Sequence, residues 1–246
     1  MALWLLGYPE TALAEISHAI NAARETAHAP TVMFALGMTS FTQICCRNYA
    51  RAKAQIDECA LLANEKSAAF WKVLAMIHQG WVMALSGNSA EAIRTIGTGI
   101  TEYRLVGAKI WATAWLSDLA LFHANLGKFD DALRCISEAI TAVETTKERW
   151  WEPEVHRTAG EIALLSPERD VAKAEEYFER ALAVARQQQA KSWELRAAMS
   201  LARLWRDQGK VQQARELLAP VYGWFTEGFD TSDLKEARAL LEELGA

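Results

Sequence analysis

Features that build strands, disulfides and metal sites are scarce in this sequence. The 246 residues include five prolines, thirteen glycines and four cysteines. Runs of β-branched residues with alternating polarity are missing, which argues against a β-sheet. Cys45, Cys46, Cys59 and Cys135 form no C-x-x-C pair and have no histidine at zinc-finger spacing. We therefore interpret them as buried, reduced thiols.

Signals for membrane insertion, export and nucleic-acid binding are also missing. No apolar run reaches the ~20 residues that span a bilayer. The apolar start, Met1–Leu6, is too short for a signal peptide and has no basic flank. A net charge of −5 is unfavourable for phosphate contacts. We expect a cytoplasmic protein whose partners include neither nucleic acid nor membrane.

Motifs that carry catalysis are likewise not found. The sequence has no G-x-x-x-x-G-K-[ST] loop, no H-E-x-x-H and no G-x-S-x-G. We interpret His123 as a core residue rather than a ligand. We predict no catalytic residue, no metal and no cofactor, and therefore no enzyme activity in this chain.

What the sequence does contain is a repeat with a period near 40 residues. The series of alanines that marks it is Ala12, Ala52, Ala92, Ala132, Ala174 and Ala214. A larger apolar residue follows each alanine after four positions, and a mostly small residue follows after seven. These offsets lie on one face of an α-helix. Each repeat is therefore predicted to have one helix with a small–large–small stripe, against which a second helix packs closely.

Two further series share this period. Five residues before the alanine stands Gly7, Gly87, Gly127 or Gly209, or an arginine in the other two copies, and glycine suits the left-handed position that ends a helix. A tryptophan series comprises Trp71, Trp111, Trp151 and Trp193. Because this residue recurs in four repeats, we interpret it as packing between repeats. The alanine and tryptophan series share one two-residue insertion, which we place after Gly160.

These patterns predict an all-α, superhelical solenoid of six helix-turn-helix repeats with a C-terminal capping helix. The predicted repeats are 1–29, 30–69, 70–109, 110–149, 150–191 and 192–230, with the cap at 231–246. Such repeats bury their apolar faces by stacking into a single domain. The first helix of the first repeat is expected to begin before Met1, so we expect the chain to be a fragment of a longer protein.

The pattern resembles the tetratricopeptide repeat, and the fourth repeat resembles it best, with Leu119-Ala120, Gly127, Phe129, Ala132, Ile136 and Ala139. Repeats of 40 residues are similar to the helical region of signal-transduction ATPases of the maltose-regulator type. The last hundred residues are more specific. Stretches beginning Glu148-Arg-Trp-Trp-Glu-Pro, Ala174-Glu-Glu-Tyr-Phe, Ser200-Leu-Ala-Arg-Leu-Trp and Leu217-Leu-Ala-Pro-Val-Tyr resemble bacterial proteins that join a class III adenylate/guanylate cyclase domain, a predicted ATPase domain and a helical array. In that family the catalytic domains lie upstream, so the resemblance implies a non-catalytic region.

First helices line the concave face in this repeat type, and the repeat phase maps candidate partner-binding residues onto that face. These are Phe34, Phe41, Leu74, Ile77, Trp81, Leu121, Glu154, Arg157, Arg196, Arg203 and Arg206. The apolar residues are predicted to hold a helix or an apolar segment, and the arginines to clamp a carboxylate. Two alternatives stay open: the apolar residues pack between coiled repeats, and Glu154, Arg157 and Glu161 form a solvated salt-bridge ladder.

We therefore expect a regulatory interaction module of a signalling protein. Its partner would be a protein or peptide, with the upstream ATPase and cyclase domains of the same polypeptide as candidates and a homodimer as an alternative. A free-standing adaptor and a small-molecule sensor array are the rival functions.

Overall fold

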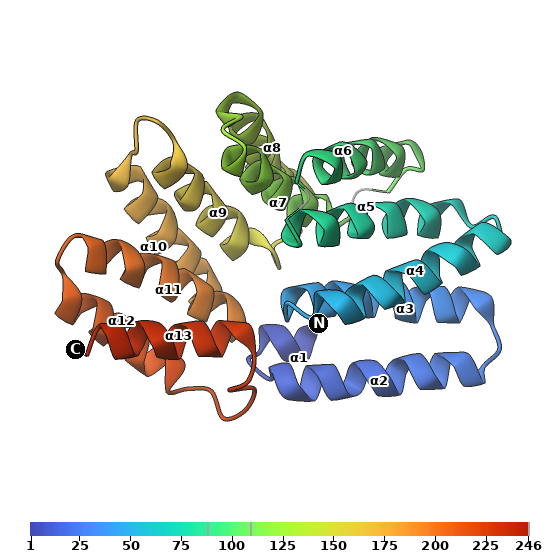
Figure 1. Ribbon diagram of the computed structural model, residues 1–246, viewed down its shortest axis with the longest axis horizontal. Helices are drawn as coiled ribbons and strands as arrows, with labels where there is room; N and C mark the ends of the chain where they lie inside the picture. Colours follow the sequence, from blue (N-terminus) through green and yellow to red (C-terminus); the bar gives the residue numbers. More distant parts are fainter. Residues whose placement is uncertain (88, 109, 246) are drawn as a thin grey trace. The chain divides into compact units, whose positions relative to one another are not determined.

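The computed structural model describes residues 1–87, 89–108 and 110–245. These residues form thirteen α-helices and no strand, which confirms the predicted all-α helical repeat solenoid (Figure 1). The helices are α1 (Ala2–Leu5), α2 (Pro9–Glu25), α3 (Ala29–Cys45), α4 (Tyr49–Glu65), α5 (Ala69–Leu85), α6 (Ser89–Leu105), α7 (Ala112–Asn125), α8 (Phe129–Thr146), α9 (Glu152–Leu165), α10 (Val171–Gln187), α11 (Lys191–Asp207), α12 (Val211–Tyr222) and α13 (Ser232–Glu243). No helix in the described ranges has both the length and the apolar character needed to cross a membrane.

The chain divides into two compact units. The first unit comprises Met1 and Glu10–Ile110, and the second comprises Ala2–Pro9 and Trp111–Ala246. The second unit therefore combines a short N-terminal segment with the C-terminal half of the sequence. The chain passes from one unit to the other at residues 9–10 and again at residues 110–111.

Turns with a left-handed residue recur at half the predicted period. The residues with positive φ in these turns are Gly7, Ala27, Arg47, Ser67, Gly87, Gly107, Gly127, Lys147, Arg169, Gln189 and Gly209. Successive members are 20 residues apart, except that Arg169 follows Lys147 by 22 and so shows where the insertion lies. Each such residue ends a helix by turning the backbone away from the helical path. The sequence pattern predicts the left-handed residue only at the ends of the first helices, where glycine is common. Most second helices end at a left-handed residue that is not glycine, so the pattern does not reveal those turns.

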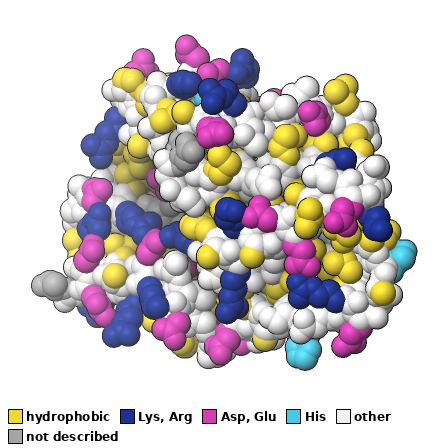
Figure 2. Space-filling model, turned by 45° about the vertical axis from the view of Figure 1, so that its right-hand side comes forward, with side chains coloured by type: hydrophobic (Ala, Val, Ile, Leu, Met, Phe, Trp, Pro, Cys, Tyr) yellow, Lys and Arg dark blue, Asp and Glu magenta, His cyan; other side chains and the backbone are white. Residues whose placement is uncertain are grey.

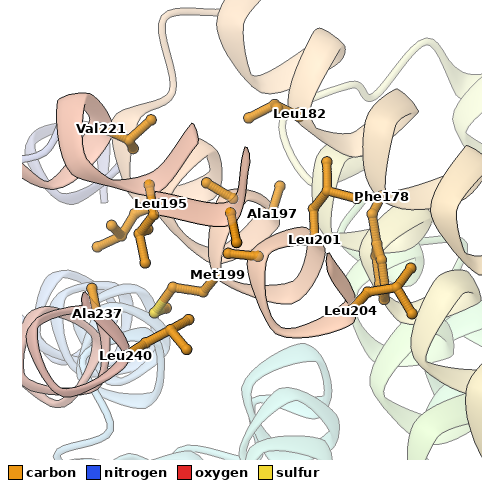
Figure 3. Close-up of a cluster of buried hydrophobic side chains, with 14 of the residues drawn as sticks. Phe178, Leu182, Leu195, Ala197, Met199, Leu201, Leu204, Val221, Ala237 and Leu240 are labelled. Atoms are coloured by element: carbon orange, nitrogen blue, oxygen red, sulfur yellow. The ribbon is translucent and has the colours of Figure 1, made fainter. Parts of the chain in front are cut away.

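The small–large–small stripe forms the inner face of the second helices. Ala52, Ala92, Ala132, Ala174 and Ala214 have no exposed surface. The larger residues that follow them, from Ile16 to Leu218, are also buried. Gly160 on α9 shows how close the helices come, because a methyl group there would overlap the ring of Phe178 on α10. In the second unit this packing continues into a cluster from α10, α11, α12 and α13 that includes Phe178, Leu201 and Leu240 (Figure 3).

The repeated tryptophans pack between successive repeats. Trp151 and Trp193 are buried, with their ring centroids 4.7 Å apart in an edge-to-face arrangement. Trp71 lies against Gly37 of the preceding repeat. Trp111 and Trp151 stand just before α7 and α9 rather than inside them, because these helices begin later than α5 and α11 do relative to the repeat.

Candidate functional site

Most of the apolar residues predicted for the concave face belong to the first unit. Phe41, Leu74, Ile77 and Trp81 are buried, and the rings of Phe41 and Trp81 meet edge to face at 4.9 Å. The expectation that these four side chains are exposed is therefore wrong. Phe34 is the exception, with 58% of its surface exposed.

The close approach of α3 and α5 is the physical reason for this burial. A methyl group on Gly37 of α3 would lie 2.9 Å from the Trp71 ring and 3.0 Å from Leu74 of α5. At this separation the side chains between the two helices are enclosed. His78 is enclosed as well, where burial lowers the pKa of its imidazole to about 3. Its Nδ1 lies 3.0 Å from the Ser40 hydroxyl oxygen.

The predicted charged residues of α9 form a tight network in the second unit. Arg157 donates to both carboxylate oxygens of Glu154, from Nε at 2.8 Å and from Nη2 at 2.7 Å. Its Nη1 donates to Glu161 at 2.9 Å, and the Ser200 hydroxyl of α11 donates to the same carboxylate at 2.7 Å. Burial lowers the pKa of Arg157, but Glu154, Glu161 and Asp118 more than offset this, so that the pKa lies above its usual value.

This network corrects the idea of a solvated ladder. The ion pairs between Arg157 and the two glutamates do form, but Glu154 is only 4% exposed. Helix α11 packs against α9 and brings Ser200 onto the arginine and Glu161. Because a buried charge needs its partner, the three side chains are held in one arrangement. Leu121 on α7, which was predicted for the same face, is half-buried.

Arg196 of α11 joins four structural elements of the second unit. Its Nε and Nη2 donate to Asp233 of α13 at 2.9 and 2.8 Å, and its Nη1 lies 3.9 Å from Glu154 of α9. Its guanidinium carbon lies 5.1 Å from the ring centre of Trp4 and 5.2 Å from that of Trp193. These distances are in the range of cation–π attraction.

The other two predicted arginines pair with the same terminal helix. Arg203 contacts Glu236 at 3.2 Å and Arg206 contacts Glu243 at 2.6 Å. The carboxylates that these arginines were predicted to clamp in a partner are thus supplied by α13 of the same chain. The Arg206–Glu243 pair is exposed and the Arg203–Glu236 pair is partly buried. Pairs near the surface contribute on the order of 0–1 kcal/mol each.

The N-terminal segment Ala2–Pro9, which we name the strap, lies on α11. Trp4 is 2% exposed, and its ring meets that of Trp193 edge to face at 4.7 Å. The Ser192 hydroxyl donates a hydrogen bond to the Trp4 carbonyl oxygen. A tryptophan, an arginine and a serine of α11 therefore surround one strap residue.

The rest of the strap crosses the start of α11 and the loop before α13. A methyl group on Gly7 would lie 2.5 Å from the ring of Trp224 and 2.9 Å from Cβ of Lys191. The ring of Tyr8 lies 5.8 Å from that of Trp224, and Pro9 sits against Gly228.

Sequence reasoning did not find the strap contacts. It treated Met1–Leu6 as the last turns of a first helix. Trp4 and Trp224 stand outside the repeating tryptophan series, but so do Trp81, Trp115, Trp150 and Trp205, so the sequence alone does not single out the strap.

The second unit also has a cleft between α8, α9 and α10, with a volume of about 380 Å³. Ile136, Ile140 and Ile162 are among its apolar lining residues, and Glu168 and Lys173 are charged ones. It opens where the insertion lengthens the turn between α9 and α10. Another lining residue, Tyr177, stacks on the buried His156 with centroids 6.3 Å apart. Burial first, and Arg180 second, lower the pKa of His156 to about 4, although Glu152 opposes the change.

Charges on the surface are mixed. On the face drawn in Figure 2, Lys and Arg side chains alternate with Asp and Glu, and apolar side chains occur between them in small groups. Within the part of the chain that the structure describes, no three His, Cys, Asp or Glu side chains are grouped as metal ligands would be.

The second unit also carries a match to a family model. Residues 195–220, in α11 and α12, match the tetratricopeptide repeat. A chain in the crystal structure of the APC/C hetero-tetramer Cut9-Hcn1 has a similar fold, with a TM-score of 0.60 over 98% of the present chain and 16% sequence identity. The present chain spans 46% of that chain. The search of curated proteins returned no match. The likeness establishes a shared helical-repeat fold.

Proposed function

We propose that this chain is a non-catalytic protein-interaction module, and that the second unit binds peptide segments on the face around α11. The observation that carries this proposal is the strap. An N-terminal segment of the chain already lies on that face and buries a complete tryptophan side chain there. A tetratricopeptide match over the same helix supports the assignment.

The chemistry of the face fits a peptide with an aromatic anchor. Trp193 provides an apolar wall, Arg196 provides a planar cation, and Ser192 donates to a main-chain carbonyl. Tryptophan and arginine are frequent hot-spot residues in protein interfaces, because they combine a large contact area with directional polar groups.

The setting that best accommodates such a module is a signalling protein. The resemblance of the last hundred residues to cyclase–ATPase proteins supports a role in which occupancy of the helical array regulates other domains, in the cytoplasm. A free-standing adaptor that joins two proteins would use the same face. For the first unit, the exposed Phe34 is the apolar residue that we retain as a contact for a partner.

A peptide-display selection tests the proposed function. Random 12-residue peptides are selected against the full wild-type chain and against the full chain with Trp4→Ala. The affinity of the enriched peptides is then measured for the wild-type and Trp4→Ala chains, and for the same two chains carrying the additional substitution Ser192→Ala. Loss of one hydrogen bond to a main-chain carbonyl should weaken binding by about 2- to 10-fold.

The matched control is Thr95→Ala on α6, which removes a hydroxyl that bonds to its own helix at Glu91. This change should leave peptide affinity as it was. If neither protein enriches peptides, or if Ser192→Ala and Thr95→Ala behave alike, the proposed face is wrong.

A further inference from the structure

We propose that the strap is an exchangeable intramolecular ligand of the second unit, and that the same face accepts in its place a partner peptide with tryptophan followed three residues later by glycine. This inference rests on the proposed function and specifies its ligand. It follows from how the strap is held, how its sequence matches its surroundings, and how it is connected to the chain.

Tryptophan is the residue that the face recognises first. The Trp4 ring contacts two groups of α11: it meets the ring of Trp193 edge to face at 4.7 Å, and its centre lies 5.1 Å from the guanidinium carbon of Arg196. An aliphatic side chain would retain the burial but would lose both the cation–π attraction and the aromatic pairing. The Ser192 hydroxyl bonds to the main chain, so it fixes the position of the residue without selecting its type.

Glycine is required three residues later for two independent reasons. Gly7 has a backbone φ of +91°, a conformation that residues with a Cβ atom rarely adopt. A Cβ atom at this position would also lie 2.5 Å from the Trp224 ring, 2.9 Å from Cβ of Lys191 and 3.2 Å from the ring of Phe225. The turn brings the next residue, Tyr8, onto Trp224. The strap therefore satisfies a recognition pattern rather than simply covering an apolar surface.

The strap is suited to exchange because it brings its own local structure. The amide groups of Leu6, Gly7 and Tyr8 donate to carbonyls of Ala2, Trp4 and Leu3 within the strap. The helix α1 has four residues, which is too short to be stable without its contacts. Glu10, the residue that follows the strap, belongs to the first unit. A free peptide of the same sequence can form the same local bonds and the same contacts.

Competition between strap and peptide has a predictable size. A tethered ligand acts at an effective concentration on the order of millimolar, so the intact strap should weaken the apparent affinity of a free peptide. Weakening the strap should therefore strengthen binding of the peptide. Trp4→Ala removes the anchor of the strap but leaves α11 and Trp224 unchanged.

The test uses a fluorescein-labelled peptide with the sequence of residues 2–10, ALWLLGYPE, and measures its anisotropy with the full chain. We expect the Trp4→Ala chain to bind the peptide at least about tenfold more tightly than the wild-type chain does. Peptides with alanine in place of the tryptophan or of the glycine should not bind. The control chain is Trp71→Ala, which removes a tryptophan of the first unit and should behave as the wild type does.

Equal affinity of the wild-type and Trp4→Ala chains for the peptide would overturn the inference. Equal binding of the peptide that lacks tryptophan would overturn it as well. If Trp4→Ala loses helical circular dichroism, Gly7→Ala takes its place, because it displaces the strap by overlap with Trp224 and keeps the tryptophan. If display-selected peptides bind through Ser192 but the strap peptide does not bind, the proposed function stands and strap exchange is refuted.

Discussion

Two glycines of α6 allow the close packing of this fold to be measured. Gly97 and Gly99 are two residues apart in the interior of the same helix. A methyl group on Gly99 would overlap Cγ1 of Ile77 and lie 3.4 Å from its Cδ1, whereas a methyl group on Gly97 would meet no atom within 4 Å. Replacing each glycine by alanine changes the helix propensity by almost the same amount, so the difference in stability between the two variants reports the packing around Gly99.

The expected magnitudes follow from these environments. Alanine is more favourable than glycine inside a helix by about 1 kcal/mol, so Gly97→Ala should raise the free energy of unfolding by about that amount. Gly99→Ala has the same gain but forces Ile77 to move in a packed core, which costs roughly 1–3 kcal/mol. The difference between the two variants should therefore be roughly 1–3 kcal/mol, because the propensity contributions cancel.

Urea denaturation followed by far-ultraviolet circular dichroism measures both variants, and fluorescence checks that the transition has two states. The reasoning is refuted if Gly99→Ala is as stable as Gly97→Ala. A second comparison locates the cause. In an Ile77→Ala background the overlap is gone, so the two alanines should then stabilise the chain equally.

Two further predictions concern buried ionisable groups of the second unit. His156 has a folded-state pKa of about 4, below its usual value of 6.5, so the unfolded chain binds its proton first as the pH falls. The free energy of unfolding should then decrease between pH 6.5 and pH 4, by up to about 3 kcal/mol, and urea titrations of His156→Gln should show a flatter dependence. Arg157→Met deprives the buried Glu154 of its bidentate partner and should cost about 3–5 kcal/mol of stability, while adding Glu154→Gln to it should recover most of the loss. A single-variant cost below about 1 kcal/mol in the same denaturation assay would contradict the buried network.

The repeat pattern made the helices predictable because it records direct packing. Residues such as Ala52 and Ala132 must be small where two helices touch, so their spacing reports the fold. The same phase predicted which side of a first helix faces inward, but not how near the next helix comes. That distance depends on Gly37 and on the side chains it admits, which is why Leu74 and Trp81 are buried rather than exposed.

Contacts between distant positions could not be predicted in this way. The phase placed Arg196 on the inner side of α11, and the structure does bring it together with Glu154 of α9. Its pairing with Asp233 of α13 and its contact with Trp4 join segments that no local spacing relates. Long-range partners of this kind are determined by the path of the whole chain.

Arg196 also explains why the ligand of this face should be defined by tryptophan. A guanidinium group donates hydrogen bonds in its plane and attracts aromatic rings to its flat surface. The in-plane donors Nε and Nη2 are directed to Asp233, so α13 holds the group in a fixed orientation. Trp4 and Trp193 both lie within 5.2 Å of the guanidinium carbon. A ligand without an aromatic ring would leave the partly buried guanidinium of Arg196 without the ring contact that Trp4 makes. A ligand with a tryptophan would make that contact and leave the pairing of Arg196 with Asp233 intact.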